Sequence, residues 1–174
     1  MTAEFIYKYA KACESLYGTN DPEKIFSERN VTVKLSPPSE LRGFICRLNG
    51  ALIVSVDVSL PESVKRMTLA HLLGHSLLHR KMISSGKAFE EGSLPKDIYD
   101  READIFAAEL LISDKIIADL RESGMSDARI VSSFGAIREL ACSKLFSMRS
   151  RGVGTEDEAR RADFLRRCDV ELFY

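Results

Sequence analysis

Apolar residues recur at helical spacing at the beginning of the chain. From Ala3 to Tyr17 they return every three or four residues, so they share one face of a helix. Gly18 follows directly, and glycine commonly ends a helix because it adopts left-handed backbone angles without strain. The pattern predicts an amphipathic N-terminal helix that packs on the rest of the domain.

The pattern then changes to short apolar segments rich in β-branched residues. A short alternating segment covers residues 31–35, and two longer segments cover residues 43–48 and 51–58. Asn49-Gly50 joins the two longer segments, and this residue pair strongly favours a tight hairpin turn. We therefore expect a small antiparallel sheet.

Helical spacing returns after this sheet. Ser59-Leu60-Pro61-Glu62 has the form of a capping box with proline in the first turn, which predicts that a helix begins here. On this helix His71 and His75 lie one turn apart on one face, the spacing with which two imidazoles bind one metal ion. His79 lies two turns beyond His71, about 12 Å along the helix, which is too far to share that ion. We expect His79 to be a helix-end or packing residue.

A second amphipathic helix is predicted from about residue 100. Asp100 continues the inward face of this helix toward its start, and Glu102 lies on the flank of the same face. Both could be metal ligands, but acids are also favoured in a first helical turn by the helix dipole. The apolar stripe consists of Ala103, Phe106, Ala107, Leu110 and Leu111.

The segments around and after these helices carry weaker signals. Residues 84–97 contain glycine, proline and serine, so we expect a solvated loop, whose pair Glu90-Glu91 is a second source of a carboxylate. After Leu111 the pattern is helical, with a break around Phe134-Gly135. Late arginines alternate with acids, which favours a solvated helix face. They include Arg149, Arg151, Arg160, Arg161, Arg166 and Arg167.

Composition limits the classes of function. The chain has 174 residues, of which 45% are hydrophobic, enough for one domain with a buried core. The formal charge of −1 argues against a protein that coats nucleic acid or anionic membranes. No segment resembles a signal peptide or a membrane span, so we expect a cytoplasmic protein. The cysteines form no C-x-x-C pair and are expected to be reduced thiols. They are Cys13, Cys46, Cys142 and Cys168.

The residues around the two histidines resemble a known family. Thr-Leu-Ala-His-x-Leu-Gly-His-x-Leu-Leu-His is similar to the zinc-binding helix of the ImmA/IrrE metallopeptidases, which usually reads Ala-His-Glu-Leu-Gly-His. In H-E-x-x-H chemistry the glutamate takes a proton from the attacking water. Leu72 occupies that general-base position here and cannot accept a proton.

A second stretch carries the same resemblance. Residues 100–113 are similar to the family pattern E-x-x-A-[N/D]-x-F-A-x-x-L-L-x-P, whose leading glutamate is the third zinc ligand. In that register Asp100 is the ligand, and its side chain is one methylene shorter than the family glutamate. Asp104 would bind the other ring nitrogen of a ligating histidine and so orient it. Glu102 is the alternative ligand if Asp100 cannot reach. The resemblance covers about residues 40–148, where a segment at 133–141 resembles the end of the family core.

We therefore expect an α+β fold with an N-terminal helix, a small antiparallel sheet, a two-helix gluzincin-like zinc site and a helical C-terminal part. A metallopeptidase-like domain would cover residues 1–120 and a helical extension residues 121–174. The resemblance implies zinc bound by His71, His75 and Asp100.

Three functional classes follow. The first is a degenerate peptidase, with little or no hydrolysis, that binds a repressor or antitoxin-like protein partner. The strand from Ala51 to Val58 is the expected sheet edge for that partner. The second is an active zinc peptidase with a relocated base, Glu102 or an acid of residues 84–97. The third is a metal-independent regulator whose C-terminal helices bind DNA through residues such as Arg138 and Lys144, and the low charge makes direct DNA binding the weaker hypothesis.

Overall fold

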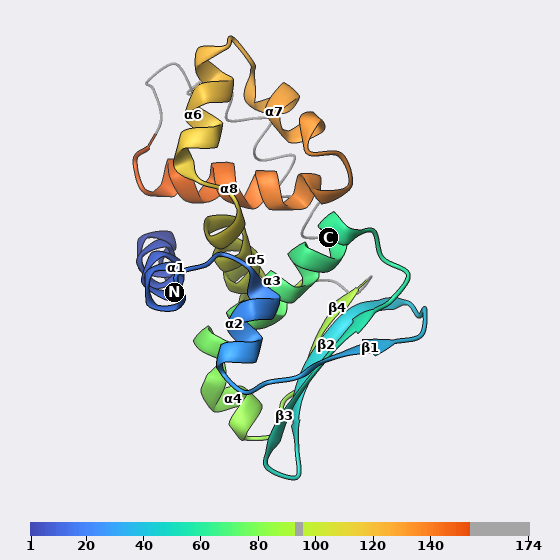
Figure 1. Ribbon diagram of the computed structural model, residues 1–174. Coiled ribbons are helices and arrows are strands. Elements are labelled where there is room, and N and C mark those ends of the chain that lie inside the picture. The colour runs from blue at the N-terminus through green and yellow to red at the C-terminus, as the bar shows by residue number, and fades with distance from the viewer. Residues whose placement is uncertain (93–95, 154–174) are drawn as a thin grey trace.

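The computed structural model describes residues 1–92 and 96–153, which form an α+β fold, as the sequence predicts (Figure 1). The sheet and α4 lie at one end, α6, α7 and α8 at the other, and α3 and α5 between them (Figure 1). The helices are α1 Ala3–Tyr17, α2 Pro22–Glu28, α3 Glu62–Leu78, α4 Arg80–Ser84, α5 Ile98–Leu111, α6 Asp114–Glu122, α7 Asp127–Ser133 and α8 Arg138–Ser150, with a 3₁₀ turn at Gly135–Ile137. The strands are β1 Val33–Ser36, β2 Leu41–Leu48, β3 Ala51–Asp57 and β4 Phe89–Gly92.

The N-terminal helix is confirmed. The hydroxyl of Thr2 accepts a hydrogen bond from the backbone N–H of Phe5 and caps the start of α1. Gly18 ends the helix with a left-handed φ of 63°. The inward face of α1 buries Ile6 and Ala10 and packs on α5.

The sheet is mixed, which corrects the expected antiparallel arrangement. Its strand order is β1-β3-β2-β4, and β1 runs parallel to β3. The Asn49-Gly50 hairpin is confirmed, since both residues have positive φ, 50° and 81°. The chain reverses once before β2 and again at this hairpin, so β1 and β3 point the same way. Because β3 lies between β1 and β2, the expectation that Ala51–Val58 is a sheet edge was wrong.

The start of α3 also differs from expectation. Pro61 is the residue that precedes the helix, and no side chain caps it. Ser59 donates its hydroxyl and its backbone N–H to Oδ1 of Asp57 instead, each at 2.7 Å. The predicted capping box is therefore wrong, because the acid at the end of β3 binds Ser59 and closes the turn before the helix begins.

Helices α3 and α5 pack closely because of a glycine. A Cβ atom on Gly74 would lie 3.1 Å from Cα and 3.2 Å from the carbonyl oxygen of Ala103. Ordinary van der Waals contacts of carbon atoms are longer, so only glycine permits this approach without a shift. The short contact sets the distance between the histidine helix and the acidic helix.

The C-terminal helices join the core through a buried ion-pair cluster. Lys144 of α8 lies 2.5 Å from carboxylate oxygens of both Glu109 and Asp114, and Arg151 contacts the same two acids at 3.0–3.1 Å. Lys144 and Glu109 are fully buried. The domain boundary expected after residue 120 falls within α6, and α8 packs directly on α5.

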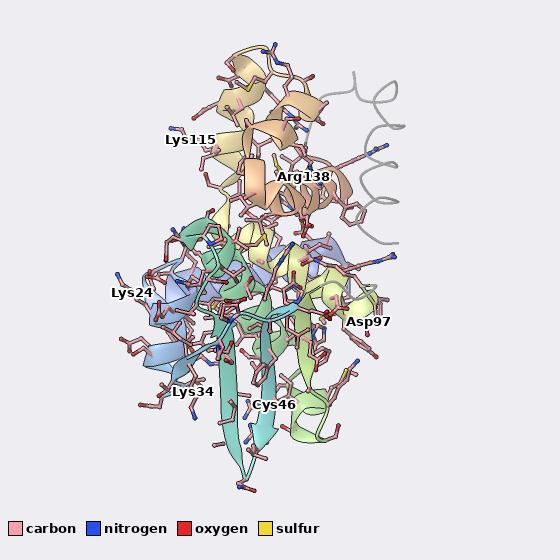
Figure 2. All side chains as sticks on the ribbon, turned by 90° about the vertical axis from the view of Figure 1, so that its right-hand side faces the viewer. Lys24, Lys34, Cys46, Asp97, Lys115 and Arg138 are labelled. Atoms are coloured by element: carbon pink, nitrogen blue, oxygen red, sulfur yellow. The ribbon has the colours of Figure 1, made fainter. Side chains whose placement is uncertain are left out.

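This cluster corrects one expectation about nucleic-acid contacts. The DNA-binding hypothesis used Lys144, whose side chain is inaccessible to a phosphate because it lies inside the protein. Arg138 is exposed at the start of α8 (Figure 2). Among the late arginines, Arg151 belongs to the buried cluster and therefore departs from the expected solvated helix face. Arg160, Arg161, Arg166 and Arg167 lie outside the described part of the chain.

We predict that Lys144→Met destabilises the protein by about 3 kcal/mol, because it leaves buried carboxylates with one cation fewer. Urea unfolding followed by circular dichroism measures the change. The exposed Arg138→Met is the matched control and should change stability by no more than about 0.5 kcal/mol. Equal stability of the two variants would contradict the role assigned to the cluster.

Candidate metal centre

Two histidines of α3, His71 and His75, and His79 directly after the helix form a continuous buried row. The Nε2 atoms of His71 and His75 lie 3.0 Å apart, and Oδ1 of Asp100 lies 3.3 Å from Nε2 of His75. The ligand atoms of His71, His75 and Asp100 all lie within 4.8 Å of one another. Zinc bonds nitrogen and carboxylate oxygen at about 2.0–2.2 Å, and ligand atoms at these separations can surround one such ion. The structure thus brings together the three residues that the sequence analysis proposed as metal ligands.

Asp100 has two roles that the sequence analysis treated as alternatives. Its Oδ2 accepts a hydrogen bond from the backbone N–H of Asp97, at 2.8 Å, and completes a capping box at the start of α5. Asp97 itself is exposed at that helix start (Figure 2). The other oxygen of Asp100 faces His75. The shorter side chain reaches the histidine because Gly74 lets α5 approach α3 closely.

The protonation states of His75 and Asp100 suit a cation. Burial lowers the pKa of His75 to about 3, so its imidazole is neutral at neutral pH. Burial raises the pKa of Asp100, but the adjacent imidazole of His75 and the hydrogen bond from the Asp97 backbone outweigh this effect and bring the pKa to about 2. A neutral imidazole and an ionised carboxylate are the forms that bind metal ions.

Asp104 lies behind His71, where the sequence analysis expected an orienting residue. Its Oδ1 is 2.8 Å from Nδ1 of His71, and Lys96 lies 2.9 Å from its other oxygen. An N–H of His71 on Nδ1 can donate to this carboxylate, which leaves Nε2 directed toward His75. Burial lowers the pKa of His71, but the carboxylates of Glu91 and Asp104 raise it above its ordinary value.

Glu102 and His79 lie together on the far side of His75. Oε2 of Glu102 is 2.9 Å from Nε2 of His79, and Nδ1 of His79 is 3.0 Å from Nδ1 of His75. The N-terminal ammonium of Met1 also contacts Glu102. Glu102 therefore does not join His71 and His75 in this structure, either as a ligand or as an acid facing them. His79 packs at the end of α3, as the sequence analysis expected.

Leu72 packs against the sheet. It is fully buried, and its Cδ1 lies 3.2 Å from the position that a Cβ atom on Gly43 would occupy. Gly43 belongs to β2, whose inward face α3 covers. The residue in the general-base position thus fills space between helix and sheet with hydrocarbon.

Glu91 is the one acid at the centre that the sequence analysis placed in a solvated loop. Part of that predicted loop is strand β4, which pairs with β2 and places Glu91 opposite Gly43. Glu91 is only 3% exposed, and its Oε2 lies 3.2 Å from Nε2 of His71. Glu90 points outward and is exposed. The spacing of Phe89 and Glu91, two residues apart, was the available signal for a strand with these two side chains on its inner face.

A cleft runs along β4 beside the candidate metal centre. It has a volume of about 190 Å³ and is open to solvent. Its lining includes Phe89, Glu91, Lys96, Asp97 and Asp100. Asp100 and Glu91 thus connect the buried histidines with an accessible groove at the edge of the sheet.

One comparison with known proteins identifies a family for this chain. A search of curated proteins found no match. Within the described residues, no helix is long and apolar enough to cross a membrane. The family model of the IrrE N-terminal-like domain, peptidase family M78, matches residues 34–146, a span that includes both histidines, Glu91 and the acids of α5. The chain therefore belongs to this ImmA/IrrE family of metallopeptidase-like proteins.

Proposed function

We propose that this protein is a degenerate zinc metallopeptidase that binds a segment of a regulatory protein partner and hydrolyses it little or not at all. The observation that carries this proposal is the contrast between the two parts of the site. The ligand atoms of His71, His75 and Asp100 converge, whereas Leu72 presents only hydrocarbon at the general-base position. A repressor or antitoxin-like partner is the class that the ImmA/IrrE resemblance implies.

The set of side-chain atoms supports zinc as the ion. Two imidazole nitrogens and a carboxylate oxygen are ligands that zinc accepts in a tetrahedral site, with one position left open. Each can offer a lone pair, and their mutual distances of 3.0 and 3.3 Å favour a cation between them. When bound, zinc would supply Lewis-acid polarisation of a peptide carbonyl.

The cleft beside β4 supports peptide binding. In the described sheet β4 pairs with β2 alone, so its other edge is available to an added strand. Main-chain hydrogen bonds to an edge strand give affinity without catalysis. The groove is lined by charged residues of both signs, which can face the side chains of a partner. They are Lys87, Lys96, Glu90 and Asp97.

An active peptidase is the second candidate, and Glu91 is the observation in its favour. Gly43 pairs with Glu91 and also lies against Leu72. The carboxylate of Glu91 on the sheet is therefore near Leu72, the position on the helix where a catalytic glutamate is missing. However, Arg42 and Lys96 each lie 3.6 Å from this carboxylate. Acceptance of a proton would weaken both ion pairs, and we therefore rank this candidate second.

The first prediction from the proposed function concerns the metal. Protein without a histidine tag should bind about one zinc per chain, and His75→Ala should abolish binding because two remaining ligands rarely hold zinc. Asp100→Ala also leaves only two ligands and should likewise abolish binding, whereas removal of Asp119, an exposed acid of α6, by Asp119→Ala should not change it. Elemental analysis and competition with a chelator measure both effects. Absence of zinc from protein refolded with excess metal would overturn the zinc assignment.

The second prediction concerns hydrolysis of a peptide library, followed by mass spectrometry with and without chelator. The unaltered protein should stay near background, and Leu72→Glu should raise hydrolysis, because a positioned base contributes about 10² to 10⁴ in rate. Leu72→Glu combined with Glu91→Gln should be the most active form, since two neighbouring carboxylates repel each other. Chelator-sensitive hydrolysis by the unaltered protein that Glu91→Gln abolishes and Glu90→Gln leaves intact would favour the second candidate.

The third prediction locates the partner. Peptides selected from a random library for binding should slow amide hydrogen exchange in β4, because an added strand covers its free edge. Strand β1, the opposite edge of the same sheet, is the internal control and should exchange at its original rate. Protection confined to β1 or to α8 would place the binding surface elsewhere.

A further inference from the structure

We propose that His79 and Glu102 fix the tautomer of His75, and that they are positioning residues of the metal centre. This inference rests on the proposed zinc site and goes beyond it, because it assigns a role to two residues that bind no metal in that site. It explains why a third histidine and a glutamate, neither of which lines the cleft, are buried together at the end of α3.

The hydrogen-bonding capacity of Glu102, His79 and His75 decides which ring nitrogens carry protons. A carboxylate accepts hydrogen bonds, and a neutral imidazole carries one N–H and one accepting nitrogen. Glu102 lies 2.9 Å from Nε2 of His79, so His79 donates from Nε2. Its Nδ1 is then an acceptor, and it lies 3.0 Å from Nδ1 of His75. His75 must therefore carry its proton on Nδ1.

The consequence falls on the other nitrogen of His75. With the proton on Nδ1, Nε2 has a free lone pair directed toward His71 and Asp100, as a ligand requires. The competing tautomer would carry the proton on Nε2 and donate it to Asp100, 3.3 Å away. That arrangement would occupy both groups with each other and oppose metal binding. The pair His79 and Glu102 favours the binding-competent tautomer.

Aromatic contacts keep the rings in this arrangement. The ring of His75 stacks on Phe89, with centroids 3.9 Å apart and planes at 25°. His79 packs edge-on against Tyr99, with centroids 5.2 Å apart. Both histidines are buried, so rotation of either ring would need displacement of these neighbours. The hydrogen-bond chain is thus held by packing as well as by its own bonds.

The two proposed zinc histidines are oriented in different ways. His71 has a carboxylate, Asp104, directly on its Nδ1. In the described structure, Nδ1 of His75 faces the ring of His79 instead of a carboxylate, and Glu102 acts on His75 through that ring. Asp104 and Glu102 therefore serve equivalent purposes at different distances from the metal ligands.

Nitrogen-15 NMR of the imidazoles tests the proposal in metal-free protein. The chain has three histidines, so single substitutions assign the three rings once any tag is removed. We expect the Nδ1–H tautomer for His75 in the unaltered protein. His79→Phe and Glu102→Leu should shift His75 toward the Nε2–H tautomer and weaken zinc binding about 10- to 100-fold. Glu102→Gln should preserve both properties, because its amide oxygen still accepts from His79.

Asp104→Leu is the matched control, which should alter the His71 signals and leave the His75 tautomer unchanged. An Nε2–H tautomer of His75 in the unaltered protein would overturn the proposal, and this result needs no variant to fold. An unchanged tautomer in folded Glu102→Leu would overturn it as well. Because the tautomer is measured without metal, failure of the unaltered protein to bind zinc would count against the proposed function and leave this result separately decided.

Discussion

The candidate centre depends on the close packing of α3 against α5 at Gly74. His71 and His75 come from α3 and Asp100 from α5, so the separation of these two helices decides whether the three side chains meet. Asp100 is a short side chain, and its reach suffices only because the backbone of Ala103 lies against Gly74. The same approach places Asp104 behind His71 and Glu102 beside His79. Gly74 thus makes possible both the contacts between the proposed ligands and the contacts of Asp104 and Glu102 behind them.

Local patterns in the sequence predicted local structure well. Helical periodicity gave the limits of α1, and Asn49-Gly50 gave the hairpin, because each depends on neighbouring residues. Spacing on one helix face likewise placed His71 and His75 together. Features that depend on distant partners were missed. Ser59 binds Asp57 instead of capping the helix, and β3 is a central strand because β1 pairs with its outer edge.

Glu91 illustrates this limit most clearly. Its segment is short and contains two acids, so composition indicated a loop. Pairing with β2 created the strand, and the pairing buried one acid beside His71 while the other stayed in solvent. The position of Lys144 was missed for a similar reason, since its partners Glu109 and Asp114 lie on other helices. A charge in a sequence reveals its sign, but its burial depends on partners supplied by the fold.

The contacts around Gly43 bear on how this chain can evolve. Leu72 and Glu91 meet at the same glycine from opposite elements, so the residues at these two positions constrain each other. A glutamate introduced at position 72 alone would enter a site that already holds the carboxylate of Glu91. A larger residue at position 43 would collide with the carbonyl of Ser55. Substitutions at positions 72 and 91 should therefore be coupled, so that the effect of a change at one position depends on the residue at the other.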